Sequence, residues 1–449
     1  MSTLKARWEG FLSSKRIGED HSSDYDNFRS PYQRDKDAIV FSSHFRDLQG
    51  KTQVFSLTTN NVRNRLTHSM EVASVGRNLA EIVGRALIER HNLENITAQD
   101  FGVILEAACL AHDIGHPPLA HAGEQAFSEY FSKNEARFKK KVGLSYNDFL
   151  HFEGNAKNMR ILCDLEQPSR QGGMRLTSAV LGAISKYPRL SHGQVGNKRE
   201  VKSWCSKKFN FFLKDKDVLG NLASNLGLQA TGNPNEYHRS PLAYLVEASD
   251  DICYGLVDIE DALTMKVIDY ADAVELLSPI TDNTIERGDL TKVEHVHRLR
   301  AKAIGKLLYE VADIFLANEE AIINGEFKGD LLDHVSVAKE FKNLKTFAAK
   351  NIYVSDVALD VRTAGYNIIE KLLELLVDSA MDVFDNGDQA SSKSEAYLLT
   401  LKEPMRSRVL EAKTQYDVLI NITDHISSMT DNEAVATYKN FLGASIQTL

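Results

Sequence analysis

The stretch LAHDIGHPPLAHAGE, residues 110–124, decides how the rest of the chain is interpreted. It contains three histidines, one aspartate and one glutamate within 13 positions, and a glycine and two prolines interrupt it. Apolar residues at helical spacing predict a buried helix over 98–113, with an inward face of Val103, Ile104, Ala107, Ala108 and Ala111. Because glycine and proline end helices, His112 and Asp113 are expected at the C-terminal end of this helix.

The sequence on either side of this stretch is also predicted to be helical. From Val72 to Leu87 apolar residues repeat every three or four positions, and Asn64 or Thr67 is expected to cap that helix. Strand signals are few, and the best candidate is KTQVFSL at 51–57. Further amphipathic stretches cover about 241–265, 296–323, 353–384 and 405–427. We therefore predict an all-α fold.

Composition excludes several classes of protein. The chain has 449 residues, of which 43% are hydrophobic and 26% charged, as in ordinary globular proteins. A formal net charge of -9 argues against a surface devoted as a whole to nucleic acid or membrane. The four cysteines show no CxxC spacing, and neither a signal peptide nor a transmembrane run is evident. We expect a cytoplasmic protein that does not associate with membranes.

Two segments are expected to be loops. Residues 189–208 (RLSHGQVGNKREVKSWCSKK) are basic and contain helix breakers. A solvated face is the ordinary interpretation of such a charge run, and a contact surface for anions or nucleic acid is the alternative. Residues 384–394 (FDNGDQASSKS) are expected to form an exposed loop.

The histidine–aspartate pair suggests a metal site. Adjacent helical residues point about 100° apart, so His112 and Asp113 converge only on something that lies between them, such as a metal ion. Such a pair alone is weak evidence, because a structural hydrogen bond is the commoner explanation. His68, at the start of the preceding long helix, and Asp250, on a helix far downstream, complete a set of two imidazoles and two carboxylates. This set suits an octahedral first-row divalent ion.

The order of these residues resembles that of the HD-domain metal-dependent phosphohydrolases. More specifically, the chain is similar to the deoxyguanosine triphosphate triphosphohydrolases and their deoxynucleotide triphosphohydrolase relatives. The matching blocks occur in family order, and they are FRDLQGKTQVF (45–55), NRLTHS (64–69), AHDIGHPPLAHAGE (111–124), HFEGNA (151–156), LTSAVLGAISKYP (176–188) and SPLAYLVEASDDICY (240–254).

The resemblance implies a metal set and a group that transfers protons. His68, His112, Asp113 and Asp250 would hold a divalent ion, Mn²⁺ or Mg²⁺ or another first-row metal. Asp250 is preferred to Asp251 because the family's metal aspartate precedes a tyrosine by four residues and an aspartate by eight. His121 and Glu124 correspond to a histidine–glutamate pair that serves proton transfer near the α-phosphate. His116 is also a candidate catalytic residue, although some relatives carry asparagine there.

The resemblance also implies contacts with a nucleotide, through Gln53, Arg65, Lys186, Tyr187, Tyr254 and Asp258. Arg65, Lys186 and Tyr187 would meet the phosphates, and Gln53 would meet the sugar or base edge. Tyr254 would pack along the sugar and Asp258 would meet the 3′-hydroxyl, so that ribose is excluded by crowding near C2′. Further contacts are expected from Asn155, Arg362 and Tyr366.

The function implied is metal-dependent hydrolysis of deoxynucleoside triphosphates, dGTP above all, to deoxynucleoside and tripolyphosphate. An HD-type phosphomonoesterase or phosphodiesterase, and a non-catalytic module that binds nucleotide or single-stranded DNA, remain as alternatives. We expect an N-terminal extension (1–44), an HD-type catalytic core (45–270) and a helical C-terminal region (271–449). Family members tend to form homo-oligomers, often hexamers, and the C-terminal region would provide the interface. The 189–208 loop would be the place for single-stranded DNA.

Overall fold

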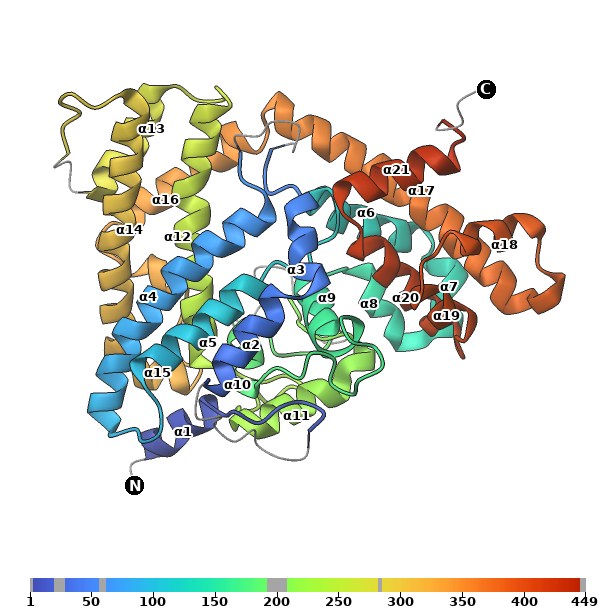
Figure 1. Ribbon diagram of the computed structural model, residues 1–449, viewed down its shortest axis with the longest axis horizontal. Helices are drawn as coiled ribbons and strands as arrows, with labels where there is room; N and C mark the ends of the chain where they lie inside the picture. The colour runs from blue at the N-terminus through green and yellow to red at the C-terminus, as the bar shows by residue number, and fades with distance from the viewer. Residues whose placement is uncertain (1–2, 20–28, 56–61, 192–207, 282–284, 445–449) are drawn as a thin grey trace.

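The computed structural model describes residues 3–19, 29–55, 62–191, 208–281 and 285–444, and it is almost entirely helical (Figure 1). The described residues contain isolated β-bridges but no strand of a sheet. The predicted all-α fold is confirmed.

One large hydrophobic core covers most of the first 352 residues. At its centre lie α4 (Arg65–His91) and α5 (Ala98–Ala111), which pack against each other. Helices α12 (Pro241–Thr264) and α14 (Lys292–Ala317) both pack against α4, and α12 also contacts α5. The other helices of this part are α1 (Thr3–Phe11), α2 (Pro31–Val40), α3 (Ser43–Asp47), α9 (Gly154–Arg160), α10 (Ser178–Ile184), α11 (Lys216–Leu226), α13 (Tyr270–Leu277), α15 (Glu319–Ile323) and α16 (Ala338–Phe347). The buried side chain of Trp8 shows that the N-terminal residues also belong to this core.

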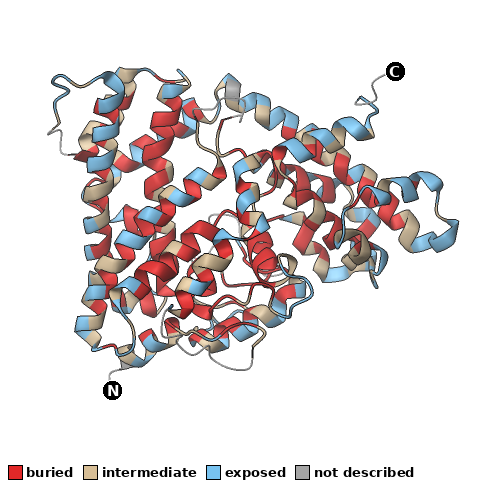
Figure 2. Ribbon diagram, viewed as in Figure 1, coloured by how far each residue is buried: buried red, intermediate tan, exposed pale blue. Residues whose placement is uncertain are grey.

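A second core joins two parts of the chain that are distant in sequence. It packs α6 (Ala120–Lys133), α7 (Glu135–Val142) and α8 (Asn147–Leu150) against the C-terminal helices. These are α17 (Asp356–Asn386), α18 (Ser392–Leu399), α19 (Met405–Leu410), α20 (Gln415–Ser428) and α21 (Asp431–Phe441). Buried residues gather where the helices of each core face one another, and exposed residues cover the outer faces and the tip at α18 (Figure 2).

The two central helices begin and pack as the sequence dictates. The Asn64 side chain accepts a hydrogen bond from the Thr67 amide, and the Thr67 hydroxyl oxygen accepts one from the Asn64 amide, so both predicted caps act together. Close packing of α4 on α5 depends on glycine, because a Cβ at Gly84 would come within 2.6 Å of the Phe101 ring. This approach places the start of α4 beside the end of α5.

Buried charges connect the two cores. The Asp424 carboxylate on α20 accepts hydrogen bonds from Lys157 Nζ at 2.9 Å and from Arg160 Nε at 2.6 Å, and all three side chains are almost completely buried. Burial of ions is unfavourable unless they are paired, so these contacts hold α9 to α20.

Some expectations from the sequence were wrong in detail. Residues 51–55 form no strand; Thr52 makes one isolated bridge with Asn64, and its amide bonds to the Asp431 carboxylate instead of a neighbouring strand. The rest of the strand expected at 51–57 lies outside the described residues. The loop expected at 384–394 is shorter, because α17 continues to Asn386 and α18 begins at Ser392.

Two of the amphipathic stretches are each divided between two helices. Residues 296–323 fall in α14 and α15, and 405–427 fall in α19 and α20. Most of the 189–208 segment lies outside the described residues. Among the helices that the structure describes, none combines the length and the apolar character needed to cross a bilayer.

Removal of the shared carboxylate should destabilise the protein strongly. Asp424→Ala leaves Lys157 and Arg160 buried without their main partner, which is expected to cost about 3–5 kcal/mol. Thermal unfolding monitored by circular dichroism would show this as a clear fall in the midpoint.

Asp417→Ala on the same helix is the matched control. Asp417 forms a partly exposed ion pair with Lys214, so its loss should cost about 1 kcal/mol or less. Equal midpoints for the two variants would contradict the role assigned to Asp424.

Candidate metal centre and active site

A cavity of about 620 Å³ opens where the start of α4, the end of α5, the middle of α12 and the first turns of α17 meet. Most of the residues expected to form a site line it, namely Gln53, Arg65, His68, His112, Asp113, His116, His121, Asn155, Lys186, Tyr187, Asp250, Tyr254 and Arg362. Asp258, Glu124 and Tyr366 are not among the lining residues.

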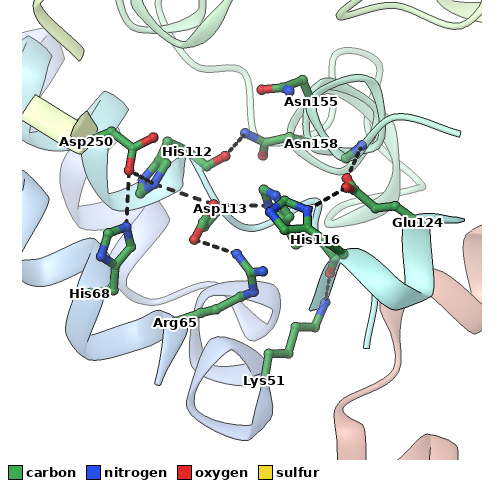
Figure 3. Close-up of polar contacts among 12 residues, drawn as sticks. Lys51, Arg65, His68, His112, Asp113, His116, Glu124, Asn155, Asn158 and Asp250 are labelled. Atoms are coloured by element: carbon green, nitrogen blue, oxygen red, sulfur yellow. Dashed lines mark hydrogen bonds and ion pairs between the residues drawn. The ribbon is translucent and has the colours of Figure 1, made fainter. Parts of the chain in front are cut away.

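Three of the four predicted metal ligands form a compact group (Figure 3). Potential ligand atoms of His68, His112 and Asp250 all lie within 4.8 Å of one another. His68 Nε2 is 3.2 Å from Asp250 Oδ1, and His112 Nε2 is 3.5 Å from the same oxygen. Helix α4, the C-cap of α5 and helix α12 therefore each contribute one potential ligand to the same site.

The protonation of His112 fits a metal ligand. Its Nδ1 lies 2.6 Å from the Cys109 carbonyl oxygen, which can only accept a hydrogen bond, so Nδ1 carries the proton. Its Nε2 is buried and, in the part of the chain that the structure describes, has no hydrogen-bond partner. In the neutral tautomer a lone pair on Nε2 faces Asp250 Oδ1 at 3.5 Å, an arrangement that a divalent cation satisfies. Imidazole nitrogen with carboxylate oxygen is also the donor set that such cations take.

Asp113 lies beside this group but is already paired. Its Oδ2 is 2.7 Å from Arg65 Nη1, and its Oδ1 is 3.0 Å from His116 Nδ1 and 3.5 Å from His112 Nε2. Burial alone would raise the pKa of Asp113, but His112 and Arg65 hold it well below its usual range. The side chain is therefore a carboxylate. Arg65 keeps its Nε without a hydrogen bond among the described residues.

The neighbouring acids Asp250 and Asp251 have different surroundings. Asp250 Oδ2 lies 3.2 Å from Lys186 Nζ, and although burial opposes it, Lys186 and His112 hold the pKa of Asp250 well below its usual range. Asp251 instead pairs with Lys345 at 2.9 Å. Of the two, only Asp250 belongs with His68 and His112 to the compact group of potential metal ligands, which we call the metal-type group.

His121 and Glu124 form a pair at the rim of the cavity. His121 Nδ1 lies 3.1 Å from Glu124 Oε2, and the Gly154 amide donates to the other oxygen of Glu124 at 3.1 Å. Burial raises the pKa of Glu124, but the hydrogen bond from His121 and the charge of His116 lower it to about 2. The His121 side chain is 73% exposed, so its other nitrogen is open to the cavity and to solvent.

Two tyrosines form the opposite wall. The ring of Tyr254 stacks on that of Tyr353, with centroids 5.4 Å apart, and both line the cavity. The Tyr353 hydroxyl donates to Asp258 Oδ2 at 2.7 Å, so Asp258 lies behind Tyr353 and is buried. Burial raises the pKa of Asp258 to about 7, against the lowering effect of this hydrogen bond.

Sequence reasoning missed several residues of the cavity. Lys208 lines it and pairs with Glu153 at 3.1 Å, and the basic run at 189–208 was the signal that could have indicated it. Tyr353 gave no such signal, because it stands alone in a stretch read only as amphipathic. Tyr366 lies just outside, where its hydroxyl contacts the lining residue Gln125.

Comparison with known proteins finds two family matches along the chain. Residues 65–194 match the HD domain family, and residues 334–440 match a family described as a phosphohydrolase-associated domain. The first match contains His68, His112 and Asp113, and the second contains Tyr353.

Full-length relatives carry a common description. A "Deoxyguanosinetriphosphate triphosphohydrolase-like protein" of Synechocystis sp. is 36% identical over 446 residues, which covers 98% of this chain and 100% of the relative. One of Pseudomonas aeruginosa is 33% identical and covers 98% of this chain and 99% of its own. A "Deoxyguanosinetriphosphate triphosphohydrolase" of Cronobacter sakazakii is 30% identical over 398 residues, 77% of this chain and 76% of that protein.

Comparing neutral variants of Asp250 and Asp251 should distinguish the loss of a metal ligand from the mere loss of a negative charge nearby. Asp250→Asn removes an anionic ligand and is expected to weaken Mn²⁺ binding by at least about 100-fold, since loss of outer contacts alone weakens metals by about 10- to 100-fold. Isothermal titration calorimetry of the purified protein measures this directly.

Asp251→Asn changes the next residue by the same atoms and the same charge. Because Asp251 pairs with Lys345 and not with the metal-type group, the Mn²⁺ affinity of this variant should stay within a few-fold of the wild type. Similar losses in the two variants would reject the assignment of Asp250 as a ligand.

Proposed function

The chain belongs to the deoxyguanosinetriphosphate triphosphohydrolase-like family of HD-domain proteins, and we propose that it hydrolyses deoxynucleoside triphosphates to deoxynucleoside and tripolyphosphate. At the coarser level it is a metal-dependent nucleotide hydrolase. We propose dGTP as a principal substrate and Mn²⁺ or Mg²⁺ as the metal.

One observation carries the proposal: a metal-type group and several cationic side chains share one cavity. His68, His112 and Asp250 lie together at its base, and Arg65, Lys186 and Lys208 also line it. A triphosphate is the kind of ligand that requires both a divalent ion and distributed positive charge.

His68, His112, Asp113 and Asp250 would hold the divalent ion. When bound, the ion supplies Lewis-acid stabilisation of charge on the α-phosphate. Arg65 keeps Asp113 in place through its ion pair, and Lys186 does the same for Asp250. Both cations retain further N–H groups that can donate to phosphate oxygens.

The remaining phosphate charge would be met by polar groups beyond Arg65 and the Lys186 ammonium. Lys208 on one side and Tyr187 beside Lys186 line the same cavity. Lysine is a mobile point charge, and arginine offers a fixed fork, so the two types suit a chain of phosphates that differ in position. These groups would stabilise the tripolyphosphate as it leaves.

His121 would move the proton in this reaction. Water attacks the α-phosphorus, the bond from that phosphorus to O5′ breaks, and its electron pair stays on O5′. The proton lost by the water is then delivered to O5′, which leaves as the sugar hydroxyl. Because Glu124 holds His121 Nδ1, the opposite nitrogen, Nε2, is the atom placed to carry this proton.

The tyrosine wall would select the sugar. Tyr254 and Tyr353 present flat stacked rings, on which a deoxyribose packs without room for a 2′-hydroxyl. Asp258 stands behind Tyr353 and is bonded to its hydroxyl, so contact of Asp258 with the 3′-hydroxyl would require an exchange of hydrogen bonds. Gln53 Oε1, buried and without a partner among the described residues, would accept a bond from the nucleotide.

Product analysis tests the proposed reaction. Wild-type protein with dGTP and Mn²⁺ should release deoxyguanosine and tripolyphosphate in equal amounts, separated by ion-exchange chromatography. In ¹⁸O-labelled water the label should appear in tripolyphosphate, because water bonds to the α-phosphorus. EDTA should stop the reaction and excess Mn²⁺ should restore it.

Asp113→Ala is the inactive control for this assay. Orthophosphate or pyrophosphate as the sole phosphate product would indicate a different HD-type phosphatase. Binding of dGTP without any product would indicate a non-catalytic nucleotide-binding protein. Either result would sink the proposed reaction.

His121→Ala should lower kcat by about 10²- to 10⁴-fold, the usual contribution of a general acid or base. KM should change far less, because His121 is not proposed to bind the phosphates. Steady-state kinetics with dGTP measures both constants.

His297→Ala provides the comparison, since His297 is exposed on α14 and does not line the cavity. It should keep wild-type kcat. A loss shared equally by the two variants, or a His121→Ala enzyme with unchanged kcat, would exclude the proposed role.

A further inference from the structure

A carboxylate from the last described helix binds two loops of the catalytic core. Asp431, the first residue of α21, is only 7% exposed. Its Oδ2 accepts a hydrogen bond from the Thr52 amide at 2.9 Å, and its Oδ1 accepts one from the Leu119 amide at 2.8 Å. Each oxygen therefore serves one loop, and the two loops are 67 positions apart in sequence.

Both loops carry residues of the cavity immediately after the bonded amide. Thr52 is followed by Gln53 and Val54, and Leu119 itself lines the cavity with Ala120 and His121 behind it. A shift of either amide would thus move a side chain proposed to contact the nucleotide or to carry the proton. Asp431 itself is not among the residues that line the cavity.

The second loop needs an external partner for its shape. Leu119 and Ala120 have φ angles of 64° and 57°, in the left-handed region, which costs roughly 1–2 kcal/mol for each non-glycine residue. Leu119 is the N-cap of α6 but offers no side-chain cap. Such a conformation persists only where neighbours hold it, and the bond to Asp431 is one such restraint.

A second contact joins the same segments. Lys51 Nζ donates to the His116 carbonyl oxygen at 2.6 Å and lies 3.4 Å from the Ser427 carbonyl oxygen. Through Lys51, the residue before Thr52, the C-terminal end of α20 is therefore connected to the His116 carbonyl. Figure 3 shows Lys51 below both His116 and Arg65.

We propose that Asp431 is a positioning residue of the hydrolytic site, which holds the loop of Gln53 and the start of α6, where His121 lies, in register with each other. This inference rests on the proposed function, because it assigns those two side chains to the reaction. It makes the C-terminal region a working part of the active site.

The chemistry of the contact requires a carboxylate. Two backbone N–H donors approach from different loops, and only an ionised aspartate offers one acceptor oxygen to each. Asparagine would keep one acceptor and turn its amide N–H₂ towards the other donor. A buried donor left without a partner is unfavourable, so one loop should be released.

Asp431→Asn and the matched control Glu433→Gln test the proposal in the full-length protein. Glu433 lies in the same first turn of α21 and loses the same charge, but it caps Thr430 and contacts neither loop. Glutamine also preserves such a cap. We expect Asp431→Asn to lower kcat for dGTP by about 10- to 100-fold, the effect of a misplacement near 1 Å, with Mn²⁺ affinity close to wild type.

Hydrogen–deuterium exchange supplies a readout that needs no turnover. In Asp431→Asn, peptides that contain Thr52 or Leu119 should exchange faster than in the wild type, whereas Glu433→Gln should leave them unchanged. If the asparagine variant does not fold, Asp431→Ser replaces it, because serine suits the start of a helix but has one oxygen for two donors.

The outcomes separate the two proposals. A kcat equal to that of Glu433→Gln, or a lower kcat without faster exchange at Thr52 or Leu119, would overturn the positioning role. A wild-type protein that releases no tripolyphosphate from any deoxynucleotide would overturn the proposed function. In that case faster exchange in the asparagine variant would still support the tie between the loops.

Discussion

The structure depends on the burial of several charged groups at one point. Asp113 and Asp250 remain ionised inside the protein, close to the imidazoles of His68 and His112. Such a concentration of negative charge is unfavourable in a low dielectric unless cations are close. Arg65 and Lys186 supply part of that compensation, and a divalent ion would supply the rest. The requirement explains why an acidic chain keeps basic residues in this cavity.

Helix packing makes this concentration of charge feasible. The glycines of α4 let α5 approach, and α12 lies against both, so that three rigid elements each present one polar side chain. The second core then covers the open side, with α6 and α17 in direct contact. Strong ion pairs between α9 and α20 keep the two cores together. Elsewhere in the cavity, Gln53 lies on a loop and His121 in the first turn of α6, and the Thr52 and Leu119 amides that precede them bond to Asp431 of α21.

Apolar periodicity in the sequence was enough to predict the long helices, whereas the choice of the proposed metal ligands, Asp250 rather than Asp251 above all, also used the resemblance to a family. Apolar periodicity marks buried helix faces, and the conspicuous residues His68, His112 and Asp250 sit on or beside such faces. The positions of Tyr353 and Asp431 beside the site could not be predicted. Each makes a contact over a long sequence distance, and neither stands in a distinctive pattern. The strand expected at 51–57 failed for the same reason. A distant carboxylate, rather than a neighbouring strand, takes the Thr52 amide.

The contact between Asp431 and the two loops has a consequence for biosynthesis. A ribosome releases the chain from the N-terminus, so the HD segment emerges several hundred residues before the acceptor of its Thr52 and Leu119 amides. Until α21 has been made, those loops lack their common anchor. A nascent or prematurely terminated chain would therefore contain His68 and His112 before the Thr52 and Leu119 amides have Asp431 as their acceptor.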